Sequence, residues 1–169
     1  METTCLIRTM QTSDAKELSQ GFINQGWPGR EEILARYFLE QECGEREVLV
    51  AEVEGALAGY ITILPCAKQG PCAEIYPELS DFNVFEPFQN QGIGNLLMEE
   101  AENRVKLISD KVTLGVGLHS GYGPAQRLYI KRGYIPDGTG VWYQNHPVAM
   151  KATCEDIGDL VLYLSKDLI

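Results

Sequence analysis

The segment from Gln89 to Asn95 places glycines and polar residues where a predicted strand gives way to a predicted helix. Glycine lets the backbone approach a bound group closely, and the first turn of a helix offers unpaired N–H groups at the positive end of the helix dipole. Such a turn holds phosphate without any charged side chain. The segment lacks the Gly-Lys-Ser/Thr of a P-loop, and Leu97 stands where the dinucleotide fingerprint has its third glycine. The spacing alone therefore leaves open both a phosphate-binding turn and a plain structural turn.

Elements on both sides of this segment are needed to position it. A predicted strand from Glu78 to Val84 leads towards it, and a strongly amphipathic helix follows it. The apolar face of that helix is predicted to contain Ile93, Leu96, Leu97, Ala101, Val105 and Ile108, with Glu99, Glu100, Glu102 and Asn103 on the opposite side.

The rest of the chain alternates between strand and helix patterns, without an internal repeat or an obvious linker. Strands are predicted over 5–8, 48–53, 57–64, 112–118, 141–144 and 160–165. Helices are predicted from Asp14, as the capping residue, to the break at Gln25–Gly29, over 31–43, and from the turn at Gly121–Pro124 to Gly133. We expect one mixed α/β domain over residues 1–169.

Charge and composition narrow the classes of function. The 169 residues include 14 Lys and Arg against 24 Asp and Glu, a formal net charge of -10. Nucleic acid is therefore not expected as a partner, and a cationic amine is favoured over an anionic substrate. No apolar run is long enough to span a bilayer and the opening residues lack a signal-peptide pattern, so we expect a cytoplasmic protein with no membrane partner. The five cysteines and two histidines lack metal-ligand spacing, so no metal is expected.

Two motifs lie about thirty residues apart in the sequence. The first is Gln-x-x-Gly-x-Gly at Gln89–Gly94, after a segment that reads Asn-Val-Phe-Glu-Pro. The second is Ala-x-x-x-Tyr-x-x-x-Gly-Tyr, from Ala125 through Tyr129 to Tyr134. Together they resemble the motifs of the GCN5-related N-acetyltransferase (GNAT) family. The resemblance covers most of the chain and implies a single N-acetyltransferase domain of α/β (α+β) class. Its central sheet would be mixed and mostly antiparallel, with one splayed strand pair and helices on both faces.

The resemblance also implies the reaction, which is transfer of an acetyl group from acetyl-CoA to a primary amine through a direct ternary complex. It implies that the CoA pyrophosphate is bound by the backbone of Gln89, Asn90, Gln91, Gly92, Ile93, Gly94 and Asn95. Val84 and Phe85 would pair with the pantetheine arm, as an added strand does at a sheet edge. The loop has no Arg or Lys, unlike many family members, so a cation would have to come from Arg127, Lys131 or Arg132, which are otherwise a solvated helix face.

Tyr129 occupies the family's general-acid position. A phenol with a pKa of about 10 can protonate the CoA thiolate as it leaves, although a tyrosine beside Leu128 on an apolar helix face is commonly a core residue. The amine must lose a proton before it attacks, and Glu78 falls where some members place a glutamate base. Asp81, His119 and a water relay without a single base are the alternatives.

The favoured acceptor is a small cationic amine, and an amine on a protein is the alternative. Trp27 and Tyr37 lie in the helical region that covers the acceptor site in this family. The competing function is a non-catalytic acyl-CoA binding or sensing domain, because the loop is uncharged; Tyr129 argues against it, since a sensor needs no proton donor. The apolar segment Val161–Leu164 would suit either a homodimer contact or simple burial.

Overall fold

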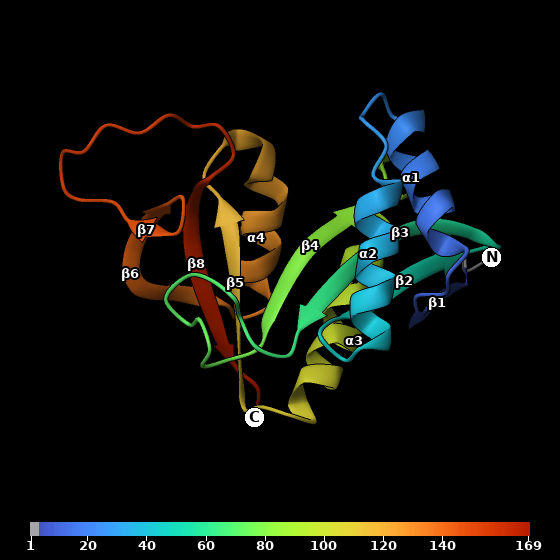
Figure 1. Ribbon diagram of the computed structural model, residues 1–169, viewed down its shortest axis with the longest axis horizontal. Coiled ribbons are helices and arrows are strands. Elements are labelled where there is room, and N and C mark those ends of the chain that lie inside the picture. The colour runs from blue at the N-terminus through green and yellow to red at the C-terminus, as the bar shows by residue number, and fades with distance from the viewer. Residues whose placement is uncertain (1–3) are drawn as a thin grey trace. The chain divides into compact units, whose positions relative to one another are not determined.

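The computed structural model describes residues 4–169. The strands in this range are β1 (Cys5–Thr9), β2 (Glu47–Val53), β3 (Ala56–Leu64), β4 (Glu78–Val84), β5 (Lys111–Gly117), β6 (Ile135–Tyr143), β7 (His146–Pro147) and β8 (Leu160–Asp167) (Figure 1). The α-helices are α1 (Asp14–Asn24), α2 (Glu31–Glu42), α3 (Ile93–Lys106) and α4 (Gly123–Lys131), and the short 3-10 helices are η1 (Glu86–Phe88) and η2 (Ser120–Tyr122). The hydrogen-bonded strand order is β1-β2-β3-β4-β5-β8-β6-β7. The sheet is mixed and mostly antiparallel, as predicted, with β4 and β5 parallel.

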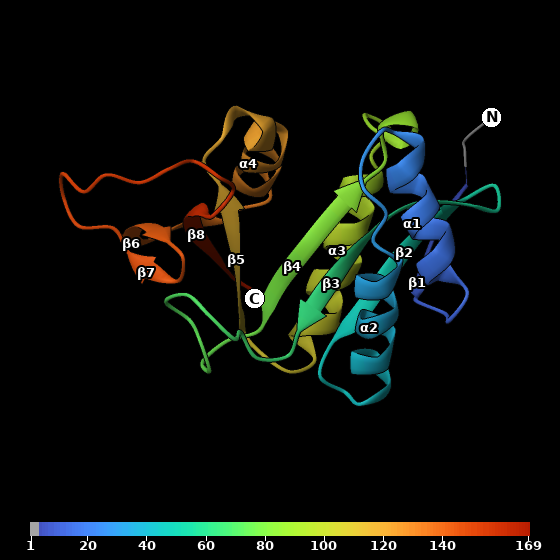
Figure 2. The ribbon, with the colours of Figure 1, turned by 45° about the horizontal axis from the view of Figure 1, so that its top comes forward.

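The chain divides into two compact units. Among the described residues, unit 1 consists of 4–65 and 79–104, and unit 2 of 66–78 and 105–169. In unit 1, α1 and α2 cover one face of the sheet and α3 covers the other (Figures 1 and 2). The core under α1 and α2 contains Leu18, Phe22, Leu34, Val48, Tyr60 and Phe85.

The first helix begins with an ion pair and not with the predicted side-chain cap. Ser13 is the N-cap residue, and its side chain makes no capping hydrogen bond. Asp14 is already helical and buried, and its Oδ2 accepts hydrogen bonds from Arg8 Nη1 and from the Gln11 N–H, both at 2.7 Å. The prediction of Asp14 as the cap was wrong. Asp14 is instead the first residue of the helix, where its carboxylate forms an ion pair with Arg8 on β1.

The buried face of α3 is rotated from the predicted one. Leu96 is 40% exposed, whereas Glu102, predicted for the outer side, is only 6% exposed. The residues that are fully covered include Leu97, Met98 and Ala101, which places the centre of the buried stripe to one side of Leu96. Ile108 is 60% exposed because the helix ends at Lys106, before that position.

The strand predicted over 141–144 is longer in the structure and begins at Ile135. It pairs with β8 in two stretches, with an irregularity between Pro136 and Val141. Gly138 and Gly140 within that irregularity have φ values of +90° and +77°. Proline and glycines with positive φ are typical of loops. The sequence pattern therefore did not indicate the first half of β6 as a strand.

β8 is an interior strand of unit 2. It pairs with β5 on one side and with β6 on the other, both antiparallel. Within it, Tyr163 and Leu164 are buried. The flanking strands cover both backbone edges of β8, and a homodimer contact through the side chains of Val161–Leu164 stays a prediction.

β3 and β4 approach each other closely at Gly59. A Cβ atom built on Gly59 would lie 2.2 Å from the Asn83 carbonyl oxygen and 2.9 Å from the Val84 Cα. Real Cβ atoms do not tolerate such distances, and both contacts are with backbone that cannot rotate away. Only glycine therefore allows β4 to run this close to β3.

We expect Gly59→Ala to lower the free energy of unfolding by about 1–3 kcal/mol, because β4 must move to relieve the contact. Urea unfolding followed by circular dichroism measures this change. Gly123→Ala is the matched control, because its Cβ meets nothing within 4 Å and its backbone is helical. Equal stability of the two variants would contradict the close approach.

Candidate functional site

The loop between β4 and α3 is held by its own side chains. Gln89 Nε2 donates a hydrogen bond to the Val84 carbonyl at 2.9 Å, and Gln91 Nε2 donates to the Pro87 carbonyl at 3.1 Å. Asn90 and Gly92 have φ values of +60° and +83°, in the left-handed region. The two glutamine side chains thus bond the loop's own carbonyls and stabilise a tight backbone path into α3.

This path ends at a helix N-terminus that suits an anion. The Gly92 carbonyl accepts the first helical hydrogen bond, from the Leu96 N–H at 3.2 Å. The buried Ile93 side chain anchors the helix start, while Gln89–Gly92 are exposed. The N–H groups of a first turn have no carbonyl within the helix to bond, and the helix dipole adds positive potential there. The geometry fits a phosphate ligand.

Val84 and Phe85 are predicted to pair with the pantetheine arm. Their backbone groups already make hydrogen bonds within the protein. The Phe85 N–H donates to the Ala58 carbonyl, and the Phe85 carbonyl accepts from the Phe88 N–H, both at 2.9 Å. The Val84 carbonyl accepts from Gln89. Phe85 is therefore a core residue. Its buried ring packs edge-on against the Phe22 ring, with 5.1 Å between the ring centroids. Pairing of this segment with a cofactor stays a prediction.

Tyr129 lies within α4 and is 7% exposed. Its carbonyl accepts a hydrogen bond from the Tyr134 N–H at 3.0 Å, and the two rings lie 6.0 Å apart. Gly133, with a φ of +93°, ends the helix as predicted and returns the chain towards Tyr129. Burial raises the pKa of the Tyr129 phenol above its usual range. Like an ordinary phenol, it is protonated at neutral pH, and burial extends this state to higher pH.

Glu78 begins β4 and is 7% exposed. It is the residue through which β4 pairs with β5, opposite Thr113. Its carboxylate lies near the Tyr163 phenol on β8: burial, together with the charges of Glu78 and Asp137, raises the pKa of Tyr163 to about 12. Unit 2 therefore contains a buried carboxyl group next to a protonated phenol; the role of Glu78 as the base stays a prediction.

Asp81 is at the centre of a hydrogen-bond network in unit 1 that the sequence did not reveal. Its Oδ2 accepts from Arg30 Nη2 at 2.9 Å and from the Tyr37 and Tyr60 hydroxyls, each at 3.0 Å. Its Oδ1 accepts from Arg30 Nη1 at 3.1 Å and from Asn83 Nδ2 at 2.9 Å. Asp81 itself has a φ of +46°, a strained value that five hydrogen bonds hold in place.

The charges of this network follow from its environment. Burial raises the pKa of the Tyr60 and Tyr37 phenols, and the charge of Asp81 raises both further. Burial alone would lower the pKa of Arg30. The hydrogen bonds with Asp81 and its negative charge have a larger effect in the opposite direction, and the pKa of Arg30 is raised. Arg30 therefore stays charged and both phenols stay neutral, as a fixed clamp between the α1–α2 connection and β4.

The remaining predicted residues have simpler surroundings. His119 is exposed, and its Nδ1 accepts a hydrogen bond from the Gly121 N–H at 2.9 Å, so it caps η2. Arg127 and Lys131 are exposed on α4. Trp27 is 59% exposed, whereas Tyr37 is a core residue.

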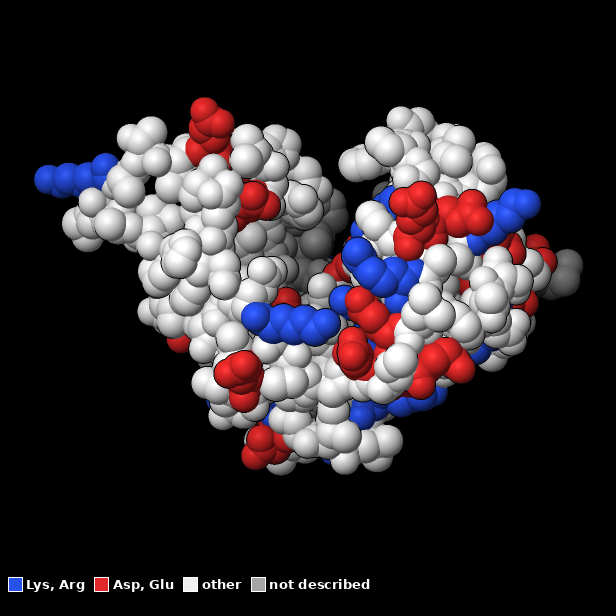
Figure 3. All heavy atoms as spheres, viewed as in Figure 1, with Lys and Arg blue, Asp and Glu red and all other residues white. Residues whose placement is uncertain are grey.

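Charged side chains of both signs lie together over α1 and α2 (Figure 3).

Among residues 4–169, no three His, Cys, Asp or Glu side chains gather as metal ligands would. Within the same range, every helix is too short or too polar to cross a membrane.

Solved structures with this fold are numerous. An N-acetyltransferase from Staphylococcus aureus aligns with a TM-score of 0.71 and 17% identity, over 99% of this chain and 100% of that one. The Salmonella typhimurium protein yncA, solved with its cofactor acetyl-CoA, has a TM-score of 0.68 and 19% identity, over 98% and 94% of the two chains. A ribosomal-protein-alanine N-acetyltransferase from Brucella melitensis has a TM-score of 0.71 and 21% identity, over 96% and 99%. These identities show a shared fold.

Sequence comparison shows the family. No curated protein sequence has significant similarity to this chain. The family model of the acetyltransferase (GNAT) domain, however, matches residues 44–136. This range is more than half of the chain and includes both the loop before α3 and the helix that contains Tyr129. The protein therefore belongs to the GNAT family of acetyl-CoA-dependent acetyltransferases.

Proposed function

We propose that this protein transfers an acetyl group from acetyl-CoA to a primary amine of a small cationic molecule. The observation that carries the proposal is the position of Tyr129 on α4, within the residues that the acetyltransferase (GNAT) family model matches. A protein that only senses acyl-CoA has no use for a proton donor at this position. The net charge of -10 supports a cationic acceptor, because it raises the local concentration of cations.

The loop Gln89–Gly92 and the start of α3 would hold the cofactor's pyrophosphate. Acetyl-CoA, when bound, supplies the reactive thioester. The fit rests on the exposed left-handed turn at Gly92 and on the N–H groups of the following helical turn. Because these donors are neutral backbone groups, they attract an anion without any charged side chain in the loop. Arg127 and Lys131 would add a weaker, salt-sensitive contribution from α4.

Tyr129 would donate its proton to the sulfur as the thioester bond breaks. Its raised pKa has a consequence for the pH dependence of the reaction. A phenol with an ordinary pKa of about 10 begins to lose its proton in mildly alkaline solution. In this protein the protonated form persists to higher pH, so the acid remains competent where the acceptor amine loses its own proton.

Glu78 would accept the proton of the acceptor ammonium before attack. Glu78 is buried, and its carboxylate lies near the Tyr163 phenol. Asp81 already accepts five hydrogen bonds, two of them from Arg30, so taking a proton would break the clamp on β4. Since the His119 imidazole nitrogen also accepts a backbone hydrogen bond, Glu78 is the better candidate.

Non-catalytic binding of acyl-CoA is the second candidate. The uncharged loop favours it, because such a loop binds its ligand through backbone alone. The two candidates share the cofactor site and differ only in the use of Tyr129 and Glu78. Substitutions at these two residues therefore separate them.

We expect Gly92→Val to weaken CoA binding by about tenfold or more, because a β-branched residue cannot hold a φ of +83° without strain. Nothing lies within 4 Å of the added Cβ, so the loss comes from the backbone path. Isothermal titration calorimetry measures the affinity. Gly26→Val is the matched control, since Gly26 has the same φ of +83° and open surroundings at the end of α1. Equal losses in both variants would place the cofactor elsewhere.

We expect Tyr129→Phe to lower kcat by about 10²- to 10⁴-fold while CoA affinity stays unchanged. The substitution keeps the ring and removes the hydroxyl. In the unaltered protein, we expect the rate to show no alkaline decline up to a pH of about 10, because the pKa of Tyr129 is raised. Tyr134→Phe is the control for packing, because that ring lies against Tyr129. A near-normal rate for Tyr129→Phe would make Tyr129 a core residue.

We expect Glu78→Gln to lower the rate at neutral pH by about 10²-fold or more, with partial recovery as pH rises, because more of the amine is then already deprotonated. Asp81→Asn should instead lower the free energy of unfolding by about 1–3 kcal/mol through the weakened Arg30 clamp. It should show no recovery of rate at high pH. Rate–pH profiles and urea unfolding of both variants distinguish the roles. The opposite pattern would make Asp81 the base.

A further inference from the structure

The start of α4 is attached to the end of β5 by a side-chain hydrogen bond within unit 2. Gln126 Nε2 donates to the Gly117 carbonyl at 2.8 Å, between residues that are nine positions apart in the sequence. Gly117 is the last residue of β5, and Gln126 lies in the first half of α4. The bond therefore fixes the helix to the strand across the short turn that contains η2.

The ring of Tyr122 packs against the same strand end. A Cβ atom built on Gly117 would lie 2.5 Å from both Cδ2 and Cε2 of that ring, closer than real Cβ atoms come to other atoms. Tyr122 is the residue directly before α4. Glycine at position 117 therefore lets the ring lie on the strand backbone, and the start of the helix contacts β5 at two points.

The turn between β5 and α4 is itself hydrogen-bonded. The Leu118 N–H donates to the Leu160 carbonyl of β8 at 3.1 Å, and the Tyr122 N–H donates to the His119 carbonyl at 2.9 Å. His119 Nδ1 in turn accepts the Gly121 N–H at 2.9 Å. These bonds fix the path of the chain from β5 into α4.

The place of Tyr129 on the helix makes its hydroxyl sensitive to this attachment. Tyr129 lies three positions after Gln126, so the two side chains emerge from one face of α4. The Tyr129 side chain is buried, and Gln126 is partly buried. Because the hydroxyl is at the end of a long side chain, a small rotation of α4 displaces it further than it displaces the helix backbone. A displacement of about 1 Å in a reacting group can lower a rate by about 10²-fold.

We propose that Gln126 is a positioning residue for Tyr129, because its bond to the Gly117 carbonyl sets the rotation of α4 about its axis. Tyr122 supports the same rotation through its contact with Gly117. Gln126 donates to the backbone of the protein itself, so its effect on the reaction passes through the helix. The inference rests on the proposed role of Tyr129 as the general acid and assigns the residue that keeps this acid in place.

Gln126→Met tests the proposal, because methionine keeps the length and the helix propensity of the side chain and removes the N–H donor. We expect kcat to fall by about three- to thirtyfold, while the affinity for CoA, measured by calorimetry, changes by less than about twofold. An unchanged kcat would overturn the proposal.

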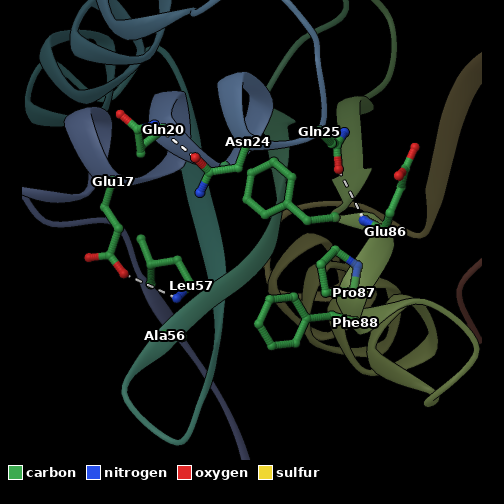
Figure 4. Close-up of a pocket in the computed structure, with 11 residues that line it drawn as sticks. Glu17, Gln20, Asn24, Gln25, Ala56, Leu57, Glu86, Pro87 and Phe88 are labelled. Carbon is green, nitrogen blue, oxygen red and sulfur yellow. Dashed lines mark hydrogen bonds between the residues drawn. The ribbon is translucent and has the colours of Figure 1, made fainter.

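Gln20→Met is the matched control. Gln20 is an exposed residue of α1, and its Nε2 donates to Asn24 Oδ1 of the same helix at 2.8 Å (Figure 4). The substitution removes the same kind of donor without releasing a helix from a strand. We expect it to leave kcat unchanged.

A double substitution separates positioning from a general structural effect. In Tyr129→Phe the hydroxyl that Gln126 would position is absent, so the addition of Gln126→Met should change the remaining rate by less than about twofold. Equal fold losses with and without the Tyr129 hydroxyl would make Gln126 a structural residue and overturn the proposal. Tyr122→Ala should give the same pattern, and it decides the question if Gln126→Met does not fold.

A spectroscopic readout is independent of the acceptor. The Cζ resonance of Tyr129, in protein isotope-labelled at tyrosine Cζ, is assigned by its loss in Tyr129→Phe. We expect this resonance to shift in Gln126→Met and to keep its position in Gln20→Met. An unmoved resonance in Gln126→Met would overturn the proposal, whether or not the protein acetylates an amine.

Failure of the proposed function gives a different result. If Tyr129→Phe retains a near-normal rate, Tyr129 is not the acid, and the positioning proposal falls with that role. If Tyr129→Phe lowers kcat and Gln126→Met does not, only the positioning proposal is overturned, and the proposed acetyl transfer remains.

Discussion

The five hydrogen bonds to the Asp81 carboxylate are the constraint on which the geometry of unit 1 depends. They hold a non-glycine residue at a φ of +46° in the middle of β4 and tie that strand to Arg30, before α2. The same stretch of β4 runs so close to β3 that only glycine fits at position 59. The path of β4 in turn sets where Gln89 and the start of α3 lie. A strained strand that side chains hold from one side thus sets the position of the loop that we propose binds the cofactor.

The second constraint is electrostatic. A chain with a net charge of -10 has to hold a polyanionic cofactor, and its loop before α3 has no lysine or arginine. We propose that the backbone N–H groups at the start of α3 resolve this conflict, because they would attract an anion while they leave the net charge unchanged. The acidic surface then remains available to attract cations.

Local sequence patterns predicted those features of the fold that depend on residues close together in the sequence. The bounds of β4, the start of α3 at Ile93 and the end of α4 before Gly133 follow from periodicity and glycine alone. The clamp on Asp81 could not be predicted, because Arg30 is 51 positions away in the sequence. Nor could the buried Glu102, since its burial depends on what packs against α3. The position of Tyr129 in its motif predicts a general acid. Motif spacing does not show that burial raises the pKa of its phenol.

The central claim is that the chain is a catalyst and uses acetyl-CoA to acetylate a small cationic amine. A panel of primary amines incubated with the protein and acetyl-CoA, with release of free thiol as the readout, tests this most directly. We expect thiol release above the rate of thioester hydrolysis for cationic amines, strongest at mildly alkaline pH, and formation of the acetylated amine by mass spectrometry. Binding of acetyl-CoA without thiol release for any amine would contradict the claim and make the protein an acyl-CoA sensor.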